Sequence, residues 1–184
     1  PLLLAIKVSQ DHKYHGPALA IIARVLAMTK DPNVYESALK AQIVSAEATK
    51  LPTNIEKAYK QYLAQGKDET LRKEVALGLM QNLMDQKKWA EAESFGLDQL
   101  VKYTFHRTEM AAQLIEIYKT TKQGEKERLF SLRMAGNDFK GKYFENYKRL
   151  TVAMVSAKTK MRTATGSDLG LLLEIEPKAL TVNE

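Results

Sequence analysis

Residues 136–142, Gly-Asn-Asp-Phe-Lys-Gly-Lys, have the G-x-x-x-x-G-K spacing of a phosphate-binding loop. In such a loop, backbone N–H groups surround the phosphates and a Ser or Thr directly after the Lys binds magnesium. Here the next residue is Tyr143, whose side chain cannot make that contact. The preceding residues 127–134 have the pattern of a helix rather than a strand. We therefore predict a glycine-rich connection and no nucleotide site.

Other residue types that could perform catalysis or bind a metal are sparse. Asp11, His12 and His15 could form part of a metal site, but no third ligand of clear geometry accompanies the two histidines, so surface imidazoles are expected. His106 stands alone, no Ser lies in a nucleophile-elbow motif, and the chain contains no Cys. Carboxylates are dispersed among lysines at the spacing of solvated helix faces. We expect no enzyme activity, no metal and no cofactor.

The positive charge of the chain is concentrated in one stretch. The formal net charge is +6, and residues 119–162 contain 12 basic and 4 acidic residues, whereas the rest contains 16 and 18. Such a stretch could attract an acidic protein surface, nucleic acid or anionic lipid. The alternative is a solvated, lysine-rich helical face that keeps the protein in solution.

Aromatic residues alternate with basic ones in this stretch, as in proteins that bind single-stranded nucleic acid by stacking and phosphate contact. Tyr143 and Tyr147 are expected in the core, however, which leaves Phe144 free to stack. No residue pair recurs once per repeat, as a base-reading helical repeat would require. The candidate partner-binding residues are Lys140, Lys142, Phe144, Arg149 and Lys160.

Helical periodicity dominates the chain and predicts about eight helices of about 10 to 20 residues, joined by short polar corners. The clearest helix is predicted at residues 142–162. Its expected buried stripe consists of Tyr143, Tyr147, Leu150, Met154, Ala157 and Met161. Lys142, Arg149 and Lys160 lie along one edge of this stripe. Residues 169–175 could form a short helix or a strand.

The segment of residues 76–100 has a recognisable pattern. Ala76, Leu79 and Leu83 follow helical spacing, Trp89 comes at a corner, and Ala92 places a small residue where a second helix crosses the first. This pattern resembles a tetratricopeptide repeat, and similar hairpins recur at spacings of roughly 34 to 38 residues. The other hairpins depart from it: Arg24 replaces a bulky apolar residue, and residues 51–54 form an insertion.

The resemblance implies an all-α, right-handed solenoid of antiparallel helical hairpins whose concave groove binds a peptide or another protein, without catalysis. Residues 1–136 would form the hairpins, and residues 137–184 would add a basic helix and a capping segment to the same solenoid. The expected function is that of a scaffold or adaptor that binds a peptide or an acidic protein surface. Nucleic-acid binding through residues 119–162 is the alternative.

The longest apolar stretches, residues 1–6 and 17–23, are far shorter than the roughly 20 residues that a bilayer-spanning helix needs. The first residue is Pro1, and no basic segment precedes the leucines that follow it. We interpret the sequence as part of a longer or processed chain rather than as one that begins with a signal peptide. A cytoplasmic location is expected, and the oligomeric state stays open.

Overall fold

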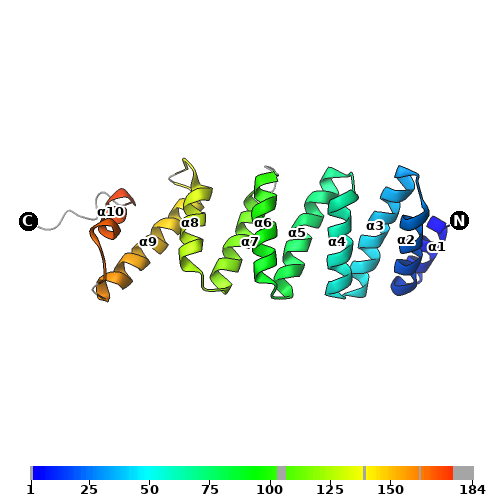
Figure 1. Cartoon of the computed structure of the whole chain (residues 1–184), viewed down its shortest axis with the longest axis horizontal. Coiled ribbons are helices and arrows are strands. Elements are labelled where there is room, and N and C mark those ends of the chain that lie inside the picture. The colour runs from blue at the N-terminus through cyan, green and yellow to red at the C-terminus, as the bar shows by residue number, and fades with distance from the viewer. Residues whose placement is uncertain (1, 103–106, 139, 162, 176–184) are drawn as a thin grey trace, which may run out of the picture. The chain divides into compact units, whose positions relative to one another are not determined.

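The computed structural model describes residues 2–102, 107–138, 140–161 and 163–175 of the chain. These residues form ten helices and no strand, which confirms the prediction of an all-α fold (Figure 1). The helices are α1 (Leu2–Asp11), α2 (His15–Met28), α3 (Pro32–Thr49), α4 (Pro52–Gln65), α5 (Glu69–Asp85), α6 (Trp89–Lys102), α7 (Arg107–Thr120), α8 (Gly124–Ala135), α9 (Lys142–Lys160) and α10 (Gly166–Ile175).

The described helices exceed the predicted number by about two, and the segment left open between helix and strand lies in α10. Both α1 and α10 have ten residues. A helix of fewer than three turns shows little periodicity in its sequence, and such a helix depends on tertiary packing for its stability. The short length of α10 explains why residues 169–175 could not be distinguished from a strand.

The chain divides into two compact units, residues 1–114 and residues 115–184. Helices α1 to α6 belong to the first unit and α8 to α10 to the second. Helix α7 begins in the first unit and ends in the second. The predicted division at residue 136 followed the repeat pattern rather than compactness, and it stays a prediction.

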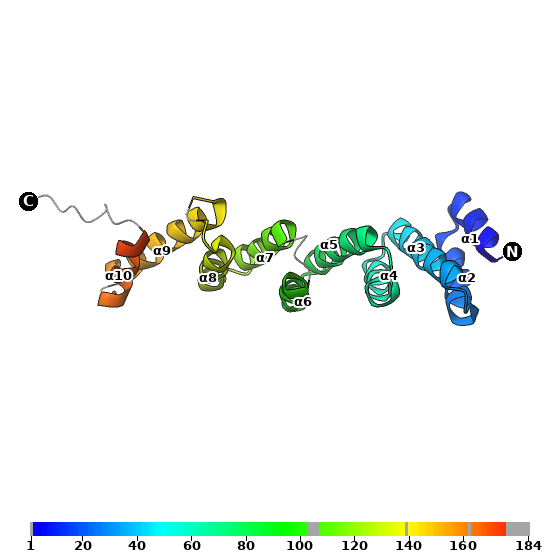
Figure 2. The same cartoon turned by 90° about the horizontal axis from the view of Figure 1, so that it is seen from above.

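Within the first unit, each helix from α1 to α6 packs against the next one along the chain. Figure 2 shows α1, α3 and α5 in one layer of this unit and α2, α4 and α6 in the other. Helix α1 also contacts α3, so these two helices lie side by side in the first layer. The short connections between the helices favour this antiparallel pairing of neighbours.

The corners inside the hairpins share one backbone conformation. They are occupied by Lys13, Lys50, Lys87 and Lys122, the described non-glycine residues with positive φ, at 61°, 54°, 58° and 57°. Successive members are 37, 37 and 35 residues apart. Each donates its backbone N–H to the carbonyl three residues earlier, at distances of 2.9, 3.0, 2.8 and 3.1 Å. A left-handed residue directly after a helix is a common way to end it.

Two of the connections between hairpins use aspartate caps. The Asp31 carboxylate accepts the backbone N–H groups of Asn33 (2.8 Å) and Val34 (3.3 Å) at the start of α3. The Asp68 carboxylate, 37 residues later, accepts two such N–H groups at 3.1 and 3.2 Å at the start of α5. These bonds satisfy donors that a helix start leaves free. Helix α4, inside a hairpin, begins at Pro52 without a side-chain cap.

The core of the first unit lies between the two layers. Tyr62 of α4 is fully buried, and its hydroxyl donates to Glu36 of α3 at 2.6 Å. The side chains packed around it come from α3, α4 and α5: Leu39, Ile43, Ala46, Ala58 and Val75. Leu79, Leu83 and Ala92, three of the repeat-like positions, are also buried. Trp89 is half-buried, so the interpretation of its ring as a core residue holds only in part.

In the second unit, α8 packs on α9 and α9 on α10. The buried positions of α9 are Tyr147, Thr151 and Val155. The other members of the predicted stripe are half-buried or exposed: Tyr143, Leu150, Met154, Ala157 and Met161. The predicted stripe is therefore partly wrong. Thr151 is accommodated because its hydroxyl donates to the Tyr147 carbonyl at 2.8 Å, a contact that hydrophobicity does not reveal.

Candidate functional site

The basic stretch lies in the second unit. Lys140 precedes α9, and Lys142 and Lys160 are its first and last residues; all three side chains are exposed. No ion-pair partner lies near these three lysines among the residues that the structure describes. Lys142 and Lys160 are each nine residues from buried Thr151, which is about two and a half turns, so both face away from the core.

Arg149, another predicted binding residue, already has partners within the second unit. Its guanidinium donates to the Asn146 side chain at 2.8 Å and lies 3.6 Å from the carboxylate of Glu127 on α8. The Glu127 side chain is 5% exposed, whereas that of Arg149 is 62% exposed. Because an unpaired buried carboxylate is costly, Arg149 serves the packing of α8 on α9.

Phe144 is half-buried, and the expectation that its ring is free to stack is wrong. Its centroid lies 6.0 Å from that of the Tyr147 ring, and the Lys148 ammonium lies 5.8 Å from the Phe144 ring. Lys142 makes a similar contact, 5.0 Å from the ring of Tyr143. Such cation–π contacts hold the aromatic rings against their own helix.

Helix α8 buries polar groups that the sequence analysis did not single out. The Asn146 side chain donates to Glu127 at 3.0 Å and to Ser131 at 2.9 Å, which joins α9 to α8. Arg128 is also buried and forms two hydrogen bonds with Glu125, at 3.0 and 2.7 Å. With these partners, the buried polar groups are satisfied as burial requires.

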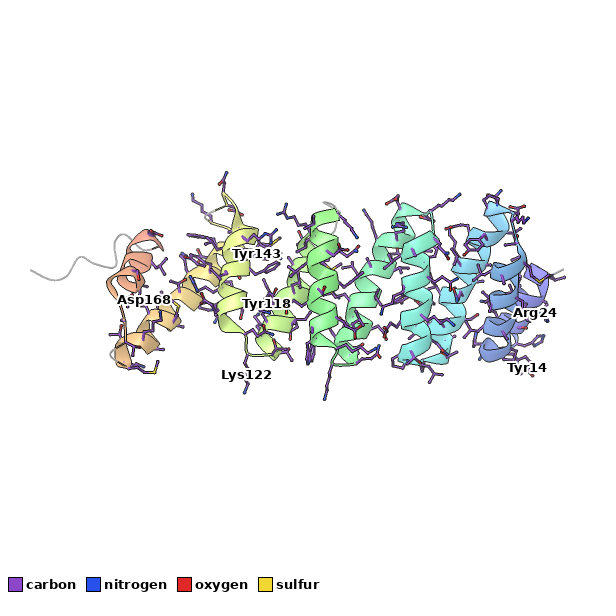
Figure 3. All side chains as sticks on the ribbon, viewed as in Figure 1. Tyr14, Arg24, Tyr118, Lys122, Tyr143 and Asp168 are labelled. Carbon is purple, nitrogen blue, oxygen red and sulfur yellow. The ribbon has the colours of Figure 1, made fainter. Side chains whose placement is uncertain are left out.

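The opposite face of α8 exposes two leucines beside a basic residue. Leu129 is 50% and Leu132 38% exposed, and the exposed Arg133 is their neighbour on this face. Figure 3 shows Lys122 at the corner before α8, projecting away from the ribbon, and Tyr118 beside α8. The two leucines could have been found from the sequence, because Leu129, Leu132 and Arg133 follow the i, i+3, i+4 spacing of one helix face.

The start of α10 is fastened to the end of α9. The Asp168 carboxylate is 2.5 Å from the Lys158 ammonium and accepts the backbone N–H of Thr165 at 2.9 Å. The Thr165 hydroxyl also donates to it, at 2.8 Å. The hydrogen bond from Lys158 and those from Thr165 lower the pKa of Asp168 to about 2. The end of the basic helix is thus held by a charged, hydrogen-bonded contact.

The first unit has a groove of about 640 Å³ between α4 and α6, with α5 beneath it. Leu79 and Leu83 of α5 form its floor and are each 1% exposed. Its walls and rim are formed by Lys60, Leu63, Ala64, Arg72, Glu91, Ser94, Phe95, Asp98, Gln99 and Lys102. Two of the three helices around this groove, α4 and α6, are the second helices of their hairpins.

A charged network lies beside the groove. The Glu56 carboxylate of α4 accepts hydrogen bonds from Lys60 (2.6 Å), Lys88 (2.7 Å) and Gln86 (3.2 Å). The bonds from Lys60 and Lys88 lower the pKa of Glu56 to about 2, although its burial acts in the opposite direction. Lys60 also lies 3.8 Å from Glu91 of α6. These contacts hold α4, the α5–α6 corner and α6 in a fixed arrangement.

The segments considered for chemistry lie in ordinary structural positions. The residues before Gly136 belong to helix α8, as predicted, so no strand leads into the glycine-rich connection. His12 stacks near Tyr14, with 6.3 Å between ring centroids. No group of three potential metal ligands occurs among the described residues, and none of the described helices is long and apolar enough to cross a membrane. His106 lies outside the described residues.

Comparisons with protein-family models, with curated proteins and with solved structures found no match to this chain.

Proposed function

We propose that this chain is a non-catalytic protein-interaction module that binds an acidic peptide or protein surface through the second unit. The observation that carries the proposal is the set of exposed lysines, Lys140, Lys142 and Lys160, which have no carboxylate partner in the described part of the chain. Carboxylates of a partner would supply the missing charge and would accelerate the encounter. The exposed Leu129 and Leu132 add apolar contact area in the same unit.

The proposal includes a fold: the hairpins belong to a right-handed solenoid of the tetratricopeptide-repeat type. The recurrence of the left-handed lysine corners at 37, 37 and 35 residues supports it, because solenoids repeat one supersecondary unit. The burial of Leu79, Leu83 and Ala92 at the repeat-like positions supports it as well.

The binding surface is tested with a charge-reversal variant in which Lys140, Lys142 and Lys160 are replaced by Glu. Arg149 is kept, because a carboxylate at that position would face buried Glu127. The probe is a labelled peptide of about ten residues, selected from a randomised library against the wild-type chain. We expect an acidic peptide, and we expect its affinity, measured by fluorescence anisotropy, to fall at least about tenfold in the variant.

The control variant replaces Lys7, Lys30 and Lys57 of the first unit by Glu. These lysines are also exposed, and the change in net charge is identical. Affinity in this variant should stay within about twofold of the wild-type value, because long-range effects are screened at physiological salt. Selection of peptides without acidic residues, or an equal loss in both variants, contradicts the proposal.

Nucleic-acid binding is the second candidate, because the same unpartnered lysines could take phosphates. The contacts of Phe144 with Tyr147 and Lys148 speak against base stacking by this ring. A labelled oligouridine of about 15 nucleotides distinguishes the two functions. If it binds more tightly than the selected peptide, with an affinity that falls steeply with salt, the nucleic-acid function replaces the protein-binding one.

A further inference from the structure

The corners inside the hairpins of the first unit lie along one of its edges. Figure 1 shows the α1–α2, α3–α4 and α5–α6 corners at the lower edge of this unit and the connections between its hairpins at the upper edge. Lys13, Lys50 and Lys87 occupy the three corners. Neighbouring corners are about 10–20 Å apart, because one or two helix-packing distances separate them. The repeat of the chain therefore places three cations in a row.

The three corner lysines are available to a partner. Their side chains are exposed, and none has a carboxylate partner among the residues of the first unit that the structure describes. The corner segments, residues 11–14, 50–53 and 85–89, contain four lysines and two aspartates. One of these aspartates, Asp85, accepts a hydrogen bond from the Gln81 side chain at 2.8 Å. The edge thus carries an excess of positive charge that attracts anionic groups.

An apolar or aromatic side chain follows each corner lysine within two residues. Tyr14 is 64% and Leu51 53% exposed, and Trp89 is half-buried. Figure 3 shows Tyr14 at the same edge of the unit. Tyrosine and tryptophan are enriched where a membrane meets water, because one end of each side chain is apolar and the other is polar. Lysines beside them can keep their ammonium groups at the level of the lipid headgroups.

We propose that this edge of the first unit docks on the surface of an anionic phospholipid bilayer. The three corner lysines contact the headgroups, and Tyr14 and Leu51 insert among them. A bilayer presents anionic groups at any spacing, so it can meet three cations that lie too far apart for one small ligand. Leu51 cannot stack on a base, and its exposure therefore favours lipid over nucleic acid. The site is independent of the function proposed for the second unit.

The probe is a phosphatidylcholine vesicle with roughly 30% phosphatidylserine, compared with a vesicle of phosphatidylcholine alone. The corner variant replaces Lys13, Lys50 and Lys87 by Asn, which removes the charges and tolerates positive φ. We expect the wild-type chain to sediment with the anionic vesicles and to bind the neutral ones much more weakly. The corner variant should bind the anionic vesicles at least about tenfold more weakly.

The control variant replaces Lys7, Lys30 and Lys67 by Gln. These lysines are also exposed, they lie on α1 and in the connections between hairpins, and the change in net charge is identical. Its affinity for the anionic vesicles should stay within about threefold of the wild-type value, because charges away from the contact are screened. Circular dichroism verifies that both variants fold.

Two further measurements identify lipid as the partner and the corners as the contact. Trp89, the single tryptophan, lies at the third corner, so brominated lipids in the anionic vesicle should quench its fluorescence. Replacing Tyr14 and Leu51 by Ser leaves the charge unchanged and should weaken vesicle binding at least about threefold. Because both side chains are exposed, this double variant also takes the place of the corner variant if the latter does not fold.

The proposal is overturned if the anionic vesicles are not bound, if Trp89 is not quenched, or if the corner variant folds and keeps full affinity. It is also overturned if replacing Lys140, Lys142 and Lys160 by Glu removes vesicle binding while the corner variant keeps it. In that case the lipid contact belongs to the basic surface of the second unit. Failure of the acidic-peptide test with intact vesicle binding would contradict only the function proposed for the second unit.

Discussion

At the scale of single residues, Glu56 shows how one carboxylate can hold several segments. It accepts hydrogen bonds from Lys60 on its own helix and from Lys88 and Gln86 at the α5–α6 corner. Its side chain is 13% exposed. Because the pKa of Glu56 is lowered from 4.5 to about 2, the folded state favours its ionised form. The contribution to stability is present above a pH of about 4.5 and is lost as the pH falls toward 2.

We predict that Glu56→Gln lowers the free energy of unfolding by about 1–2 kcal/mol at pH 7, the modest value reflecting partners that are partly exposed. At pH 2 most of this difference should be lost, because Glu56 is then about half protonated in the folded state and almost fully protonated in the unfolded state. Urea unfolding between pH 7 and pH 2 measures this. Glu74→Gln at an exposed position of α5 serves as the control and should change stability by less than about 0.5 kcal/mol. If the difference in unfolding free energy between Glu56→Gln and the wild type were the same at all pH values, the stabilising role of ionised Glu56 would be contradicted.

The positive φ angles at the hairpin corners could not be predicted from the sequence. The corner residues are Lys13, Lys50, Lys87 and Lys122, whereas glycine and asparagine are the residues that usually adopt positive φ after a helix. Their recurrence is visible only once the helix ends are known. The burial of Glu127 could not be predicted either, because hydrophobic patterning places carboxylates on the surface. Its partners Asn146 and Arg149 come from another helix, α9.

At the scale of elements, helical periodicity predicted the all-α class and the positions of the longer helices. It placed the buried face of α9 only partly correctly: Tyr147 is buried as predicted, whereas Met161, counted as core, follows the end of α9 and is 66% exposed. The exposure of Lys142 and Lys160 could be predicted from the sequence. The contacts of Arg149 and Phe144 could not, because they depend on how the side chains pack in the folded chain. The groove of the first unit could not be predicted from the sequence, because its lining residues come from three helices.

The connection between α4 and α5 depends on a glycine. A Cβ atom on Gly66 would lie 2.6–2.7 Å from ring atoms of Tyr62, which is fully buried and donates its hydroxyl to Glu36. The ring cannot move aside, so we predict that Gly66→Ala lowers the free energy of unfolding by about 1–3 kcal/mol. Thermal or urea unfolding measures the change.

The matched control for this glycine is Gly170 in α10, where an added Cβ meets nothing within 4 Å. Alanine is the better helix former, so Gly170→Ala should raise helix stability by roughly 0.5–1 kcal/mol. Opposite signs for the two substitutions are expected. A loss of stability in neither variant would show that the Tyr62 ring does not constrain the α4–α5 connection.

At the scale of the whole molecule, α7 is shared by the two units. Met110, Ala111 and Leu114 are buried in its first part, and Ile117 and Tyr118 in its last part. Because α7 contributes core residues to both units, we expect the two units to unfold together: disrupting α7 would remove buried side chains from the core of each unit.

We predict that Glu116→Pro uncouples the two units, because proline removes a backbone donor and clashes with the preceding turn at a cost of about 3 kcal/mol or more. Trp89, the single tryptophan, reports on the first unit, whereas far-ultraviolet circular dichroism reports on all helices. The two urea transitions should coincide in the wild type and separate in the variant. Glu116→Ala, which keeps the helix, should leave them together; separate transitions in the wild type would contradict the coupling.

The lysines of the four hairpin corners are also expected cleavage sites for trypsin. All four are exposed and lie one or two residues after a helix end, where trypsin can reach the peptide bond on their carboxyl side. Trypsin can also reach the exposed Lys30 and Lys67 in the connections between hairpins, so brief digestion of the first unit should release pieces that each contain one helix: residues 14–30, 31–50, 51–67 and 68–87. The two-helix repeat of the chain would then appear in a mass spectrum as peptides of alternating length, 17 and 20 residues.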